Sequence, residues 1–221
     1  MKIMVIAPHP DDETLGCGGT LFRQKQEGDE LYWGIITGIS EDAGWPQEAV
    51  KKRNAEIEAV AKKYGFTEIF NFRLPTTKMD TLPLTDLIEK ITDFYNKVEP
   101  EIIYMPFAYD VHTDHQFITK ALQATFKWFR YPHIQKVLMY ETLSETEFNF
   151  IEKNIFNPNV FVNISDNLDY KIETMKIYES EMGDFPFPRS EKTIRSLAAF
   201  RGSQSGFEAA EAFELAFYKR K

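Results

Sequence analysis

The segment HPDDE, from His9 to Glu13, places one histidine and three carboxylates in five consecutive residues, directly after the apolar run KIMVIA. Neighbouring carboxylates repel one another unless a positive charge lies among them. A helix start needs only one such acid as a cap, and an acid in the first turn complements the helix dipole. HPDDE is therefore either a solvated helix start or one half of a cation site, and the segment by itself favours the helix start.

A second polar cluster, DVHTDH, ends at His115 and also follows an apolar run, PEIIYMP. His9 and Asp12 are three residues apart, as are His112 and His115, and this spacing can bring both side chains onto one side of a turn that enters a helix. Zinc binds imidazole nitrogen and carboxylate oxygen, and catalytic zinc sites generally use three protein ligands. Any three of these four side chains would be enough to hold a zinc ion.

Apolar runs alternate with amphipathic stretches over the first two thirds of the chain, which is typical of βαβ units in a parallel sheet. Buried strands are predicted over residues 2–7, 30–37, 68–72, 101–105 and 136–141. Helices are predicted from the first carboxylates to Gly28 and over residues 47–64, 85–98 and about 114–129. For the last third we expect a strand at 160–165, helices near 169–182 and 190–202, and an edge strand, or less favourably a helix, at 211–219.

These elements predict an α/β fold, a single Rossmann-like domain over residues 1–221 with a mostly parallel sheet flanked by helices. In the doubly wound strand order 3-2-1-4, ligands bind beyond the carboxyl ends of the strands where the order reverses. HPDDE and DVHTDH follow the first and fourth strands, so we expect them to line one crevice there. If both segments lie there, one shared metal site explains them much better than two unrelated helix caps.

The composition limits the classes of function. The formal charge of −8 argues against nucleic acid as a partner, because phosphate binding relies on clustered Lys and Arg. A single cysteine, Cys17, excludes an internal disulfide and a thiolate zinc cluster. No apolar run approaches the roughly 18 residues of a transmembrane helix, and the first apolar segment is too short for a signal peptide, so we expect a cytoplasmic protein. A homo-oligomer is left open.

The strings APHPDDETLGCGGT and DVHTDH resemble the LmbE-like, or PIG-L, family of zinc-dependent de-N-acetylases, which remove acetyl groups from N-acetylglucosamine-containing substrates. RNAEIEAVAKKYG (53–65), EPEIIYMP and RGSQSGFEAAEAF (201–213) extend the resemblance over most of the chain. Two departures are Thr113, where the family often has proline, and Ala209, where it often has tyrosine. The resemblance implies a metal-dependent hydrolase whose substrate is a small N-acetylated amino sugar or its conjugate.

The resemblance also implies roles for individual residues. His9, Asp12 and His115 would bind the metal, and Asp11 would be the catalytic base. His112 would assist the oxyanion or the leaving group. The expected metal is Zn²⁺, which lowers the pKa of its bound water and polarises the acetyl carbonyl; Fe²⁺ or another divalent ion is the alternative.

Three further residues have less certain roles. Asp114 lies next to His112 in the sequence, so we expect it to stabilise an imidazolium there and to raise the pKa of that histidine. Arg53 and Asp110 are candidates for binding sugar hydroxyls or a neighbouring charged group. Substrate choice is expected to depend on residues 73–84 and 142–190, which match no pattern.

Other functions use similar residues. Two histidines and one carboxylate also form the facial triad of non-haem iron oxygenases, although the spare Asp11 favours hydrolysis. A hydrolase of a non-sugar amide is the nearest alternative, and a non-catalytic binder of sugar nucleotides is another. A dinucleotide site is disfavoured because Leu21 stands at the third glycine position of a G-x-G-x-x-G motif.

Overall fold

The computed structural model describes residues 1–150 and 154–220. Its strands are β1 (Lys2–Ala7), β2 (Glu30–Gly38), β3 (Glu68–Pro75), β4 (Ile102–Pro106), β5 (Lys136–Tyr140), β6 (Val160–Asn163) and β7 (Ala210–Tyr218). They form one sheet in the order β3-β2-β1-β4-β5-β7-β6. β1 to β5 are parallel, whereas β7 is antiparallel to both of its neighbours, β5 and β6. The predicted α/β fold with a mostly parallel sheet is confirmed.

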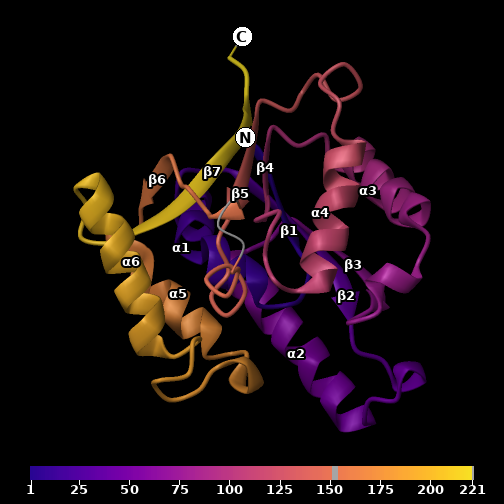
Figure 1. Ribbon diagram of the computed structural model, residues 1–221, viewed down its shortest axis with the longest axis horizontal. Coiled ribbons are helices and arrows are strands. Elements are labelled where there is room, and N and C mark those ends of the chain that lie inside the picture. Colours follow the sequence, from indigo (N-terminus) through magenta and orange to yellow (C-terminus); the bar gives the residue numbers. More distant parts are fainter. Residues whose placement is uncertain (151–153, 221) are drawn as a thin grey trace.

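The helices cover both faces of this sheet (Figure 1). They are α1 (Asp12–Gln26), α2 (Gln47–Tyr64), α3 (Leu84–Val98), α4 (Thr113–Thr125), α5 (Leu168–Met175) and α6 (Glu191–Ser205). Apolar residues of α1, α2, α5 and α6 form one core, and those of α3 and α4 form the other. Strand β1 contributes Ile3 and Val5 to the first core and Met4 and Ile6 to the second, because successive side chains of a strand point to opposite faces. Because β1 is buried on both faces, its sequence KIMVIA is almost continuously apolar.

The structure corrects two helix boundaries and the position of one strand in the second half of the chain. Helix α4 ends at Thr125, before the predicted end near residue 129, and Trp128 and Phe129 are exposed. Helix α5 ends at Met175, and a short 3₁₀ helix, η5 (Glu179–Glu181), follows it. The last strand, β7, is not at the edge of the sheet, because it pairs with β5 on one side and β6 on the other. Alternating apolar residues indicate a strand but do not reveal how many neighbours it has.

A buried ion pair from the last third of the chain completes α1. The helix is interrupted at Cys17, where φ is −144° and ψ is 22°, so nearby backbone groups lose their helical partners. Glu211 of β7 accepts hydrogen bonds from the backbone N–H groups of Gly19 (2.9 Å) and Thr20 (2.7 Å). Lys171 of α5 donates to Glu211 (2.7 Å) and to the carbonyl of Leu15 (2.7 Å). The helix that begins at Asp12 therefore depends on residues far away in the sequence.

Gly16 lets α1 pack directly against β5. A Cβ atom at this position would lie 2.1 Å from Cδ2 of Tyr140, which is much closer than two carbon atoms can approach. Tyr140 is fully buried, and its hydroxyl donates a hydrogen bond to the carbonyl of Ile6 in β1 (2.8 Å). This contact links α1, β1 and β5 beneath the segment that carries the first polar cluster.

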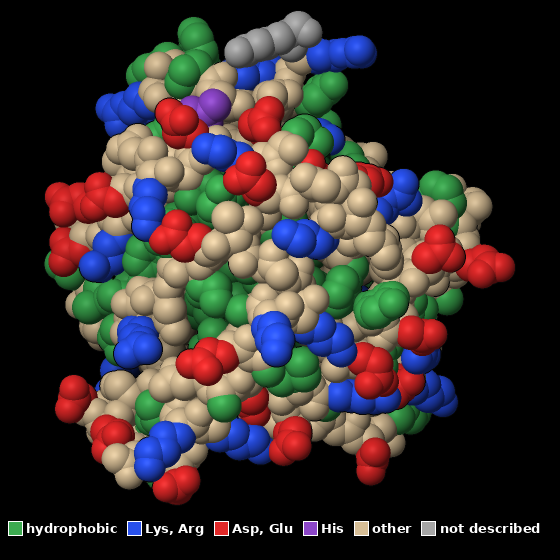
Figure 2. Space-filling model, turned by 180° about the vertical axis from the view of Figure 1, so that it is seen from behind, with side chains coloured by type: hydrophobic (Ala, Val, Ile, Leu, Met, Phe, Trp, Pro, Cys, Tyr) green, Lys and Arg blue, Asp and Glu red, His purple; other side chains and the backbone are tan. Residues whose placement is uncertain are grey.

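Charges of both signs cover the outer surface. On the face shown in Figure 2, Lys and Arg side chains are interspersed with Asp and Glu. Among the described residues, no helix combines the length and the apolar character that crossing a membrane requires.

Candidate active site

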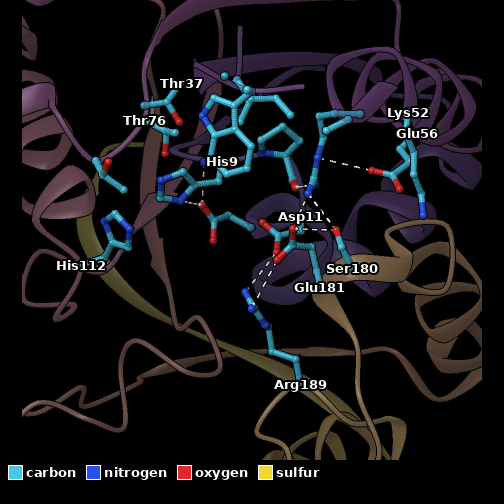
Figure 3. Close-up of a pocket in the computed structure, with 18 of the residues that line it drawn as sticks. His9, Asp11, Thr37, Lys52, Glu56, Thr76, His112, Ser180, Glu181 and Arg189 are labelled. Carbon is cyan, nitrogen blue, oxygen red and sulfur yellow. Dashed lines mark hydrogen bonds and ion pairs between the residues drawn. The ribbon is translucent and has the colours of Figure 1, made fainter. Parts of the chain in front are cut away.

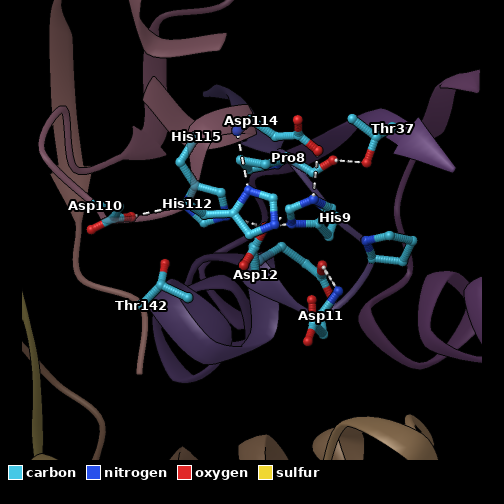
Figure 4. A network of polar contacts seen from close by, with 12 residues as sticks. Pro8, His9, Asp11, Asp12, Thr37, Asp110, His112, Asp114, His115 and Thr142 are labelled. Atoms are coloured by element: carbon cyan, nitrogen blue, oxygen red, sulfur yellow. Dashed lines mark hydrogen bonds and ion pairs between the residues drawn. The ribbon is translucent and has the colours of Figure 1, made fainter. Parts of the chain in front are cut away.

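The two polar clusters meet at the carboxyl ends of β1 and β4, which are paired strands. The first cluster leads from β1 into α1, and the second leads into α4. Ligand atoms of His9, Asp12 and His115 all lie within 4.8 Å of one another. Figure 4 shows these side chains converging from the two segments. The sequence predicts that the clusters line one crevice, and the structure brings them together there.

The carboxylate of Asp12 lies at the centre of this group. Its Oδ2 atom accepts a hydrogen bond from the backbone N–H of His9 (2.8 Å) and lies 3.4 Å from His9 Nδ1 and 3.2 Å from His115 Nε2. Burial alone would raise the pKa of Asp12, but His115 and His9 more than offset it and hold this pKa well below its usual range. Asp12 is therefore an anion, as a metal ligand must be.

Each of the two histidines near Asp12 is oriented by a further carboxylate. His115 Nδ1 lies 2.9 Å from Asp110 Oδ2, and His9 Nε2 lies 3.1 Å from Asp114 Oδ2. Because an ionised carboxylate only accepts hydrogen bonds, these contacts place a proton on the nitrogen that faces away from Asp12. The other nitrogen of each ring faces the centre of the group. Such carboxylate partners commonly fix the ring orientation of metal-binding histidines.

The group fits a cation. His115 Nε2 is buried and faces Asp12 Oδ2 at 3.2 Å without the geometry of a hydrogen bond, an arrangement that is typical of two atoms that share a further partner. Three buried carboxylates, those of Asp12, Asp110 and Asp114, surround the two imidazoles. Burial opposes protonation of both rings, but the carboxylates raise the pKa of His9 to about 9 and that of His115 well above its ordinary value. The site thus attracts positive charge, which a divalent ion would supply.

A second group, formed by His9, His112 and Asp114, also has ligand atoms within 4.8 Å. The Asp114 carboxylate is already occupied, since it contacts His9 Nε2 and accepts a hydrogen bond from the backbone N–H of Thr77 (2.7 Å). In the first group, His115 Nε2 makes no hydrogen bond, and its neighbour at 3.2 Å, the Asp12 carboxylate, is itself a member of the group. The first group therefore has the better geometry for a metal.

Asp11 lies beside the first group and is directed differently from Asp12 (Figure 3). It occupies the N-cap position of α1, but its side chain makes no capping hydrogen bond, so the simple helix-cap explanation does not apply. Its φ of 142° is a conformation that costs an ordinary residue about 1–3 kcal/mol. Burial, together with the nearby Asp12 and Glu181, raises the pKa of Asp11, although Arg189 opposes the rise. A buried carboxyl with a raised pKa accepts a proton more readily than one in water, which suits a general base.

His112 differs from the expectation drawn from its sequence neighbour. Its Nδ1 accepts a hydrogen bond from the backbone N–H of Asp114 (3.1 Å), so His112 is the N-cap of α4. The Asp114 carboxylate itself is directed to His9. Burial, followed by the charges of His9 and His115, lowers the pKa of His112 to about 4. The predicted rise in this pKa is therefore wrong, and His112 is a neutral imidazole whose Nε2–H is free to donate.

The two proposed substrate-binding residues have different positions. Asp110 is fully buried and is held by His115 and by the hydroxyl of Thr146 (2.6 Å), so it supports a histidine and does not line the cavity. Arg53 does line the cavity, and its Nη1 donates to the carbonyl of Pro10 (3.1 Å). Arg53 therefore supports the first polar cluster from α2.

A cavity of about 550 Å³ opens beside these residues (Figure 3). Residues of the first polar cluster line it together with His112 and Trp45, whose surface is 45% exposed. Glu181 and Arg189 line the cavity as well, and no local pattern in the sequence singles them out. Because they come from the segment after α5, only the folded chain brings them to the site.

Comparisons with known proteins identify relatives of this chain. Residues 4–126 match a protein family described as PIG-L, GlcNAc-PI de-N-acetylase. A diacetylchitobiose deacetylase from Thermococcus kodakarensis is 26% identical over 95% of this chain and 81% of its own length.

Solved structures share the fold. The conserved protein TT1542 from Thermus thermophilus superimposes with a TM-score of 0.77 at 22% identity, over 99% of this chain and 96% of its own. The N,N'-diacetylchitobiose deacetylase from Pyrococcus horikoshii gives a TM-score of 0.73 at 22% identity, over 97% of this chain and 83% of its own. At this level of identity, the two likenesses show the fold alone.

Proposed function

The chain belongs to the PIG-L family of GlcNAc-PI de-N-acetylases, and from this premise we propose that it hydrolyses the N-acetyl group of an N-acetylglucosamine-type amino sugar or its conjugate. One observation carries the proposal. Three groups suited to a metal ion converge in the structure, and a separate buried carboxyl, that of Asp11, lies beside them on the cavity. Amide hydrolysis needs both a site for a metal and a spare acid or base.

His9, Asp12 and His115 would hold the metal, and we propose that it is zinc. One carboxylate and two imidazoles are a common donor set for catalytic zinc. A zinc ion held there supplies a Lewis acid that lowers the pKa of a bound water and polarises the acetyl carbonyl. Asp110 and Asp114 keep the two imidazoles in the orientation that such binding requires.

Asp11 acts as the general base. Its carboxylate takes the proton of the attacking water and returns it to the amine nitrogen as the carbon–nitrogen bond breaks. An amine is a poor leaving group unless it is protonated, so the second transfer matters as much as the first. Burial raises the pKa of Asp11, which favours its taking the proton of the water.

His112 stabilises the oxyanion as a neutral donor. Because its Nδ1 accepts the backbone N–H of Asp114, the ring proton resides on Nε2, and His112 lines the cavity. A preorganised donor of this kind acts on the charge that develops on the carbonyl oxygen. Asp114 contributes indirectly, through its contact with His9.

The class of substrate rests on the relatives and on the cavity. The relative from Thermococcus kodakarensis is a diacetylchitobiose deacetylase, which acts on an acetylated amino sugar. In this chain, Trp45 offers an aromatic face at the cavity, and the partly buried Thr76 and the exposed Thr77, which carry hydroxyls, line it as well. Aromatic and hydrogen-bonding groups together suit a sugar ring.

The test is acetate release from a panel of N-acetylated amino sugars and simple non-sugar amides, run with added zinc, with added iron(II) and with a chelator. We expect release from at least one amino sugar, loss with the chelator and recovery with a divalent ion. Release only from non-sugar amides would contradict the substrate class. Activity that requires oxygen would instead support a non-haem iron oxygenase.

A further inference from the structure

Five charged side chains of alternating sign form a chain along the cavity wall: Glu56, Arg53, Glu181, Arg189 and Asp11. Arg53 Nε lies 3.4 Å from Glu56, and its Nη2 donates to Glu181 Oε1. Arg189 Nη2 lies 3.3 Å from Glu181 Oε2, and its Nη1 lies 3.4 Å from Asp11 Oδ2. Figure 3 shows Arg189 pointing toward Asp11 and Glu181.

The two arginines act on consecutive residues of the first polar cluster. Arg53 donates to the backbone carbonyl of Pro10 (3.1 Å), and Arg189 contacts the side chain of Asp11. Glu181 joins the two guanidinium groups, which would otherwise repel each other. Among the described residues, Arg189 is the one hydrogen-bond or ion-pair partner of the Asp11 carboxylate. The backbone of Asp11 has a positive φ, so the turn needs support from its surroundings.

We propose that Glu181 and Arg189 are positioning residues that fix the orientation of the Asp11 carboxylate at the cavity. This inference rests on the proposed function, in which Asp11 is the general base. The side chains of Arg53, Glu181 and Arg189 are 16%, 21% and 22% exposed, so water screens their contacts only in part. Glu181 holds Arg189 in place, and Arg189 in turn limits the rotation of Asp11.

A nearby ion pair provides a matched control. Lys52 and Glu179 join the same two elements, α2 and η5, at a distance of 2.7 Å. Their side chains are 53% and 72% exposed, and neither contacts Pro10 or Asp11. Removing this pair tests whether any loosening between α2 and η5 is enough to impair the enzyme.

The experiment compares Glu181→Gln, Arg189→Met and Glu179→Gln with the wild type, in the metal-loaded full chain. For the first two we expect kcat to fall about 10- to 100-fold, because small misplacements of a reacting group have effects of this size. KM should stay within about twofold, and the bound metal per chain should not change, because no metal ligand is altered. Glu179→Gln should behave like the wild type. Arg189→Lys keeps the charge and should recover part of kcat.

A double-mutant cycle separates positioning from other roles. In an Asp11→Asn background there is no carboxylate to orient, so adding Arg189→Met should cause no further loss of the residual kcat. An equal loss in both backgrounds would overturn the proposal, because Arg189 would then act elsewhere. A raised KM with unchanged kcat would also overturn it and would indicate direct contact with substrate.

Two further outcomes separate this inference from the proposed function. If the wild type releases acetate but Glu181→Gln and Arg189→Met retain full kcat, only the positioning role fails. If the wild type releases acetate from no amide in the panel, the proposed function fails and the positioning role fails with it. If Arg189→Met does not fold, Glu181→Gln and Arg189→Lys test the positioning role. Each of them changes few atoms and keeps a polar group at its position.

Discussion

Asp11 is the carboxyl group whose removal tests the proposed chemistry most directly. Asp11→Asn keeps the size of the side chain but removes the base, so we expect kcat to fall about 10²–10⁴-fold. The metal content should stay the same, because Asp12 and the two histidines are unaltered. Both are measured on one sample, by acetate release and by metal analysis. Full kcat in this variant would mean that another group moves the proton.

His112 caps α4 and has a proposed chemical role as an oxyanion donor, and two substitutions separate these roles. His112→Ala removes both the N-cap of α4 and the oxyanion donor, and we expect kcat to fall about 10²–10³-fold. His112→Asn retains a side-chain oxygen that can accept the N–H of Asp114, so its thermal stability should match the wild type. An Asn variant that is stable but as inactive as the Ala variant supports the chemical role. An Asn variant with wild-type kcat would assign His112 to capping alone.

The sequence points to some site residues and not to others, for a physical reason. His9, Asp12 and His115 lie in short motifs directly after buried strands, where residue type and spacing suggest metal binding. Glu181 and Arg189 lie in an irregular segment that has no such pattern, and only the folding of the chain brings them to Asp11. Residue type also cannot show which way a carboxylate faces. Asp110, for example, faces His115 and Thr146, and nothing in its local sequence indicates that direction.

At the scale of elements, the break in α1 depends on the buried pair of Lys171 and Glu211. Lys171→Met would leave Glu211 buried without a counter-charge, which typically lowers the free energy of unfolding by about 3–5 kcal/mol. The measurement is urea denaturation followed by circular dichroism. Lys176→Met, which removes an exposed lysine of the same region, should leave the transition close to that of the wild type. A loss below about 1 kcal/mol for Lys171→Met would contradict this role, since that is the range of surface pairs.

The elements of the first two thirds could be predicted closely because βαβ units repeat a simple alternation. The five parallel strands each appear as a short apolar run, and the helices between them show apolar residues at helical spacing. The last third lacks this regularity. Helix α5 is shorter than its pattern suggests, since Tyr178 turns inward, where its hydroxyl donates to buried Glu13 (3.0 Å). Contacts between distant residues decide such boundaries, and local patterns do not contain them.

At the scale of the whole molecule, metal binding should stabilise the fold. The metal ligands come from two distant segments, so they converge only in the folded chain. A ligand that binds the folded state alone stabilises it by about 2.7 kcal/mol at one hundred times its Kd. We expect zinc to raise the thermal midpoint and a chelator to lower it, and calorimetry measures both. In His115→Ala the thermal midpoint should no longer depend on zinc. A wild-type midpoint that does not change with metal would contradict the proposed metal site.

The expectation that HPDDE and DVHTDH lie close together depends on the predicted strand order. The order 3-2-1-4 makes β1 and β4 neighbours, and the structure has the same order in this part of the sheet. The continuation beyond β5 could not be foreseen, because an antiparallel strand from the end of the chain enters between β5 and β6.

This late strand has a consequence for how the protein is made. A ribosome has completed every candidate metal ligand by residue 115, long before it reaches the residues of β7. Until then the nascent sheet has an open edge at β5, and Lys171 has no carboxylate to meet it. The growing chain can therefore carry every ligand of the proposed metal site before the strand that completes its sheet exists, and during that interval chaperones would meet the unpaired edge of β5.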